Sequence, residues 1–195
     1  MLKILIDPDT FFREHDDVNI FIAVLLVVIS AILGIVMLYA NLDIIESTMI
    51  KQLQQTLPAE QARLMFEAMK YNLLLSPLIS SFVGWVIIAG LIHAVSSVFG
   101  GVGDFVKTLK LTAFGYIPSI VLFPVSFSIV RMTHELMNTP IMIVSISSTI
   151  WQFIILTFGI KNWRRLDTTK AAASVAIPLV ILTGLGIIGR LLRPT

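Results

Sequence analysis

Five segments of the chain contain no Asp, Glu, Lys or Arg, and each is about as long as a membrane-spanning helix. They are residues 18–42, 71–103, 111–130, 136–160 and 171–189. A helix needs about 20 apolar residues to cross the roughly 30 Å of hydrocarbon in a bilayer. Because the charged residues are confined to the connections between these segments, the sequence predicts an all-α, polytopic membrane bundle of five transmembrane helices.

The composition leaves little sequence for a separate soluble domain, since 56% of the residues are hydrophobic and only 13% are charged. Residues 1–195 are therefore expected to form a single membrane-embedded domain. The first apolar segment is too long for the core of a secretory signal and follows an acidic leader, so it is expected to remain as a span. The chain has no cysteine, which excludes disulfides and thiolate metal ligands.

The basic residues predict how the bundle is oriented. With five spans, the connections 103–110 and 161–170 lie on the same side as the N-terminus, and they contain six Lys or Arg residues. The short opposing connection, 131–135, contains one arginine. Basic residues in short loops are retained in the cytoplasm. We therefore expect a multi-pass protein of the cell membrane with a cytoplasmic N-terminus and a C-terminus outside.

The connector 43–70 has the spacing of amphipathic helices. Ile45, Met49 and Leu53 recur every fourth residue, and a second apolar stripe containing Phe66 follows a helix start at Pro58. This pattern predicts an extramembrane helical hairpin, with the first span continuing to about residue 57. The two stripes either pack only on each other or form a surface for a second copy or another protein.

Residues 1–17 combine a short apolar run with several charges. The apolar run Leu2–Ile6 precedes a charged stretch that contains Phe11 and Phe12. This pattern is typical of a segment that lies at the boundary between lipid headgroups and hydrocarbon. We expect it to be an interfacial anchor.

Two short motifs resemble catalytic elements but are incomplete. Gly101-Val102-Gly103-Asp104 has the form of an intramembrane aspartyl protease motif, but no span contains a second aspartate to share the proton. Asp104 is instead expected to cap the next helix. His134-Glu135 begins like a zinc-protease helix and lacks the second histidine. We expect no catalytic residues, no metal ligands, no cofactor and no nucleic-acid binding, and hence no enzyme.

A possible intramembrane polar site remains. His93, Tyr116 and Gln152 lie on three different spans, each roughly 8–12 Å from the expected cytoplasmic surface. Ser97 and Ser148 extend the polar faces of two of these spans. Such side chains either clasp the helices together or form a site for a solute, a lipid headgroup or a proton. Both interpretations stay open at this point.

Three elements, taken in order along the chain, resemble the Yip (Ypt-interacting protein) domain family, in its short archaeal or bacterial type. They are Pro8-x-x-Phe11-Phe12, then Leu91-Ile92-His93-Ala94 leading into Gly100-Gly101-x-Gly103, and then Ala113-Phe114-Gly115-Tyr116-Ile117-Pro118. The resemblance covers nearly the whole chain and implies a five-span fold with a cytoplasmic N-terminus.

The resemblance also implies a function without catalysis, namely a membrane-organising or scaffold role. Its expected partners are membrane lipids and either other copies of itself or other membrane proteins. Binding of a Rab-type GTPase, which is a property of eukaryotic members, is not expected, because their long N-terminal region and its Asp-Leu-x-Gly-Pro element do not occur here. The alternative is a small channel or carrier that uses the polar site around His93, Tyr116 and Gln152.

Overall fold

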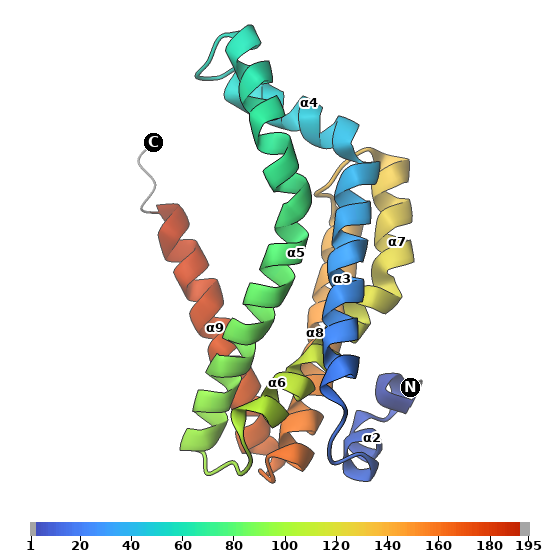
Figure 1. Cartoon of the computed structure of the whole chain (residues 1–195), viewed down its shortest axis with the longest axis vertical. Coiled ribbons are helices and arrows are strands. Elements are labelled where there is room, and N and C mark those ends of the chain that lie inside the picture. The colour runs from blue at the N-terminus through green and yellow to red at the C-terminus, as the bar shows by residue number, and fades with distance from the viewer. Residues whose placement is uncertain (1–2, 192–195) are drawn as a thin grey trace.

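The computed structural model describes the backbone of residues 3–191 and the side chains of residues 3–181. Within that part of the chain every regular element is a helix (Figure 1). The elements are α1 (Lys3–Ile6), α2 (Pro8–Glu14), α3 (Ile20–Ala40), α4 (Leu42–Leu53), α5 (Ala59–Val98), α6 (Phe105–Ala113), the 3₁₀ turn η1 (Phe114–Tyr116), α7 (Ile117–Thr133), α8 (Thr139–Trp163) and α9 (Thr168–Leu191).

The predicted helical membrane bundle is confirmed. Four stretches of the described chain are long and apolar enough to cross a membrane, namely α3, α5, the combined stretch Phe105–Thr133, and α8. Helix α9 adds a shorter described apolar stretch, Thr168–Ile181, so the count of five spans is approximate. One end of the bundle carries α1, α2 and α6 and is called the α2 end; the opposite end carries α4 and is called the α4 end (Figure 1).

Helices α3 and α5 run antiparallel, and a glycine sets their register. A Cβ atom at Gly34 would lie 2.8 Å from Cβ of Pro77, so only glycine permits this approach. Counting along both helices from this contact places Ala40, the last residue of α3, level with Tyr71. Helix α5 has 40 residues, and at 1.5 Å per residue it is about 60 Å long. Its first turns therefore extend beyond the α4 end of α3, as Figure 1 shows.

The connector between α3 and α5 is helical, but the first span ends earlier than expected. It was predicted to continue to about residue 57, whereas α3 ends at Ala40 and α4 runs off at an angle (Figure 1). The break falls at Asn41, whose side-chain Nδ2 donates to the Met37 carbonyl oxygen at 2.8 Å. Asparagine offers the backbone this local alternative to helical hydrogen bonding, which explains why the helix ends there.

The third apolar segment is also interrupted. Pro118 has no N–H, so the helix tightens into the 3₁₀ turn η1, and the amide of Ile117 donates to the Phe114 carbonyl oxygen instead. Helix α6 therefore lies at an angle to α7 at the α2 end (Figure 1). Asp104 caps α6 as expected, since its Oδ1 accepts from the Lys107 amide at 2.8 Å.

The tightest core lies at the α2 end. Phe12, Phe114 and Trp163 are buried there and meet edge to face. Helix α2 is fastened to α8 by Asp9, whose Oδ1 accepts from Lys161 Nζ and from Asn162 Nδ2, each at 2.8 Å. These two hydrogen bonds lower the pKa of the Asp9 carboxyl. The N-terminal segment is thus docked on the bundle.

Candidate functional site

A buried arginine organises the α2 end. Arg164 directly follows the last residue of α8, and only 1% of its surface is exposed. No other charged side chain in the described part of the chain is buried. Its Nη1 donates to the Gly103 carbonyl oxygen at 3.1 Å and to Thr108 Oγ1 at 3.2 Å. Its Nη2 donates to Ser97 Oγ at 2.6 Å and to the Gly101 carbonyl oxygen at 3.1 Å. One side chain therefore joins α5, α6, α8 and the loop between α5 and α6.

His93 completes this cluster. Its Nδ1 lies 2.7 Å from Arg164 Nη1 and 3.0 Å from Thr108 Oγ1. A guanidinium has donors only, so Nδ1 must accept. On this assignment the imidazole is neutral and holds its proton on Nε2, away from the arginine. We call the set Arg164, His93, Ser97 and Thr108 the arginine cluster.

Glycines allow the loop to wrap around the guanidinium. Gly100 and Gly103 have φ angles of +87° and +97°, a region that other residues rarely adopt. At Gly101 a Cβ atom would lie 2.7 Å from the Ser96 carbonyl oxygen and 3.0 Å from Arg164 Nε. The loop is tied back to α8, because the Val102 amide donates to the Arg164 carbonyl oxygen at 3.0 Å. The glycine-rich turn is therefore an arginine-binding loop.

No carboxylate forms an ion pair with Arg164 among the residues that the structure describes. Burial lowers the pKa of the Arg164 guanidinium, and the charge of the nearby Asp104 opposes this change. Because the pKa of an arginine lies far above physiological pH, the guanidinium stays charged. Carbonyl and hydroxyl oxygens solvate the charge in place of water, although Nε has no hydrogen-bond partner among the described residues. The arrangement fixes the ends of three helices.

Tyr116 lies elsewhere and has a backbone partner. Its Oη donates to the Ser81 carbonyl oxygen on α5 at 2.8 Å. Trp85, one turn further along α5, donates from Nε1 to the Leu109 carbonyl oxygen at 2.8 Å. Together these bonds hold α5 against the α6–η1 corner, so Tyr116 has a packing role.

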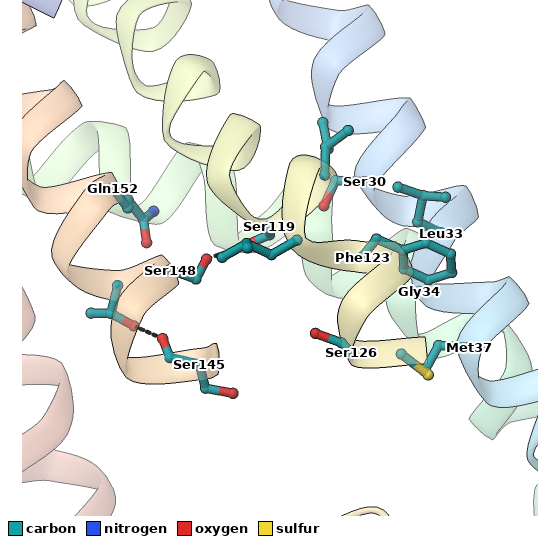
Figure 2. Close-up of a pocket in the computed structure, with 13 residues that line it drawn as sticks. Ser30, Leu33, Gly34, Met37, Ser119, Phe123, Ser126, Ser145, Ser148 and Gln152 are labelled. Atoms are coloured by element: carbon teal, nitrogen blue, oxygen red, sulfur yellow. Dashed lines mark hydrogen bonds between the residues drawn. The ribbon is translucent and has the colours of Figure 1, made fainter. Parts of the chain in front are cut away.

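Gln152 and Ser148 line a third place, a groove between α3, α7 and α8 of about 410 Å³ (Figure 2). Ser148 Oγ lies 3.1 Å from Ser119 Oγ across the α7–α8 contact. The Gln152 side chain packs on η1, where a Cβ atom at Gly115 would lie 2.9 Å from its Nε2. The predicted polar residues are thus distributed over three places: His93 and Ser97 share the arginine cluster, Ser148 and Gln152 share the groove, and Tyr116 lies apart from both.

Sequence reasoning gave Arg164 a role only in the basic loop that sets orientation. Nothing local distinguishes it from Arg165, which is exposed. The signal that points to it is the Gly100-Gly101-x-Gly103 turn, because closely spaced glycines indicate that the backbone approaches another group. The expected motif assignments are consistent with this picture: Asp104 is a helix cap, and His134 ends α7 in a left-handed conformation with φ 53°. The described residues contain no cluster of three or more potential metal ligands.

The fold and these contacts define the protein as an integral membrane protein, a multi-pass helical bundle held together by buried polar contacts at one end. The chain belongs to the Yip1 domain family, whose model matches residues 2–190. It is also similar to an uncharacterised protein of Methanocaldococcus jannaschii, with 34% identity over 123 residues, which are 62% of this chain and 81% of the relative. No solved structure matches the chain.

Proposed function

We propose that the protein is a non-catalytic membrane-organising scaffold that acts through contacts with lipids and with other membrane proteins, including copies of itself. The observation that carries the proposal is an extramembrane arm, formed by α4 and by the first turns of α5, residues 59–70. The α3–α5 register at Gly34 and Pro77 puts these turns beyond the end of the first span. Twelve residues of helix give the arm about 18 Å of height.

The arm has a buried and an exposed apolar face. Ile44 and Ile45 of α4 and Ala62 and Phe66 of α5 are buried. Leu64 and Met65 point away from this packing and are 66% and 43% exposed. The charged residues of the same turns keep the arm out of hydrocarbon, and large apolar side chains exposed outside the membrane favour protein contacts. This supports the second of the two interpretations of the connector.

The alternative of a channel or carrier is less favoured. It requires His93, Tyr116 and Gln152 to line one polar path. His93 contacts Arg164, Tyr116 donates to a carbonyl of α5, and Gln152 borders the groove. Three separate sets of partners do not support a shared conducting site.

The orientation belongs to the same proposal. The α2 end carries the basic connections that contain Lys107, Lys110, Lys161 and Lys170, so we place it in the cytoplasm and the arm outside. The chain has no cysteine, so single cysteines introduced at Gln55 and Thr168 report without background. A membrane-impermeant maleimide on intact cells is expected to label the first and not the second. The reverse pattern would invert the orientation, and equal labelling would contradict the span count. Thr195, the C-terminal residue that is expected outside, lies beyond the residues that the structure describes.

Reconstitution into liposomes tests the function. We expect the protein to cluster or reshape vesicles without conducting protons or an encapsulated dye, and Leu64→Asp to abolish the clustering. Gln61→Asp is the matched control, because Gln61 is an exposed polar residue of the same turn. Proton or solute flux that disappears in His93→Ala would support the carrier instead. Clustering that is unchanged in Leu64→Asp would remove the arm from the proposal.

A further inference from the structure

The groove between α3, α7 and α8 lies within the membrane. Ser30 is near the middle of the 21-residue helix α3, and Met37, also in the lining, is three residues from its end. The groove therefore extends from about the bilayer centre to within about 5 Å of the α4 end. The arginine cluster lies at the opposite end of the bundle, so this is a separate place in the molecule.

The lining of the groove is unusually polar for this depth and carries no charge. Seven of its 13 residues have a hydroxyl or an amide, and none of the 13, all in the described part of the chain, is Asp, Glu, Lys, Arg or His (Figure 2). The polar residues are Ser30, Ser119, Ser126, Ser145, Ser148, Thr149 and Gln152. They come from three helices and converge on one space.

Several of these groups have no hydrogen-bond partner in the part of the chain that the structure describes. Ser147, on another face of α8, donates to the Ile143 carbonyl oxygen in the usual way at 2.8 Å. The hydroxyls of Ser30, Ser126 and Ser145 and the amide of Gln152 form no hydrogen bond to any residue that the structure describes. In hydrocarbon each unpaired polar group costs free energy. A hydrogen-bonding occupant removes that cost.

A proline removes the usual helical donor of one carbonyl beside the groove. Pro124 has no N–H and so cannot bond the carbonyl of Ile120, a residue that lines the groove. Pro77 and Pro118 each deprive a carbonyl of its helical donor in the same way, but those two carbonyls accept from another donor. Ser76 Oγ donates to the Leu73 carbonyl oxygen below Pro77 at 2.7 Å, and the Ile117 amide donates to the Phe114 carbonyl oxygen below Pro118. No described side chain donates to the Ile120 carbonyl oxygen.

The chemistry of the lining selects the class of occupant. Hydroxyls and a carboxamide both donate and accept, which matches groups that do the same. None of the lining side chains carries a charge that would offset the cost of placing a phosphate or a cation at this depth. The volume of about 410 Å³ falls within the roughly 300–1,000 Å³ of typical ligand sites. We propose that the groove binds an uncharged, hydroxyl-rich group such as a sugar or glycerol moiety, borne by a membrane lipid or free as a polyol.

Binding can be measured by native mass spectrometry on protein in phosphatidylcholine nanodiscs, prepared without sugar detergents. The probe is monogalactosyldiacylglycerol, with diacylglycerol of the same chains as the reference and free galactose as the second arm. We expect the galactolipid to bind at least tenfold more tightly than diacylglycerol. Binding of galactose alone would identify a free polyol as the ligand, whereas binding of the galactolipid alone would identify a lipid.

Variants locate the site. Gln152→Leu and Ser145→Ala are each expected to weaken galactolipid binding about tenfold, and Ser147→Ala, the matched control on the same helix, to leave it unchanged. Leucine approximates the volume of glutamine, and the serine changes are small, so circular dichroism should show the same helix content in all three. Equal affinity for diacylglycerol and galactolipid, with no galactose binding, would overturn the proposal. So would the same loss in Ser147→Ala as in Ser145→Ala.

Discussion

Replacing Arg164 by methionine tests whether the arginine cluster stabilises the bundle. The substitution removes five hydrogen bonds that the guanidinium makes to two carbonyls, two hydroxyls and His93. Hydrogen bonds to a charged group contribute about 1.5–3 kcal/mol each, so the gross loss is about 7–15 kcal/mol. Methionine fills similar space, avoids several kcal/mol of charge desolvation and regains about 1.5–3 kcal/mol through apolar burial. The net cost expected for Arg164→Met is about 3–5 kcal/mol.

The assay is equilibrium unfolding in mixed micelles with increasing SDS, followed by far-UV circular dichroism. Arg165→Met is the control, since Arg165 is adjacent and exposed, and it is expected to change stability by less than about 0.5 kcal/mol. Arg164→Lys should fall between the two, because a lysine retains the charge but cannot reach both loop carbonyls with a planar fork. A loss below about 1 kcal/mol for Arg164→Met, or equal losses in the two methionine variants, would refute the reasoning.

Two further changes test the packing of the bundle. Gly34→Ala is expected to lower the free energy of unfolding by about 1–3 kcal/mol, because its new Cβ would overlap Pro77. Gly84→Ala is the control, since no atom lies within 4 Å of its Cβ, and it should be neutral or stabilising in the same SDS titration. Equal effects of the two changes would contradict the α3–α5 register. The pKa of Asp9 is lowered in the folded protein. Its hydrogen bonds therefore stabilise the docked N-terminal segment fully at pH values above the ordinary carboxyl pKa of about 3.9. This contribution is lost as the pH falls through the lower pKa of the folded state. Tryptophan fluorescence should therefore change on acidification below about pH 4, since Trp151 and Trp163 both donate to backbone of this segment. Asp9→Asn should remove part of that change and the exposed Asp16→Asn should not; identical acid profiles for wild type and Asp9→Asn would exclude the mechanism.

The sequence was sufficient for the architecture because hydrocarbon imposes one simple rule. A charge-free segment of about 20 residues becomes a helix that satisfies its own backbone, and the charged connections bound each one. The cap at Asp104 and the helical connector followed from equally local rules. Family membership also followed from short elements such as Gly115-Tyr116 and their order along the chain.

The site could not be obtained in the same way, because it depends on which side chains meet across helices. His93, Tyr116 and Gln152 were placed at similar depths, which is a property of position along each helix. Their rotation about the helix axes depends on contacts such as Gly34 with Pro77, and on the corner that Pro118 makes between α6 and α7. Arg164 and Arg165 show the same limit, since adjacent arginines differ only in what packs on them. Asn41 gives no sequence signal of its own, because a single asparagine in an apolar run does not indicate whether its side chain will end the helix.

Helix α5 links the two sides of the membrane through one continuous element. Its first turns belong to the arm, and its last turn contributes Ser97 to the arginine cluster. Between them the helix packs closely on α3 at Gly34 and Pro77. Beyond that contact, Ser81 and Trp85 fasten α5 to the α6–η1 corner, so a load on its first turns is carried along one continuous helix to that end of the bundle. A partner bound to the proposed arm would therefore reach the helix end that carries Ser97 through α5 itself, without a ligand or a charge crossing the membrane.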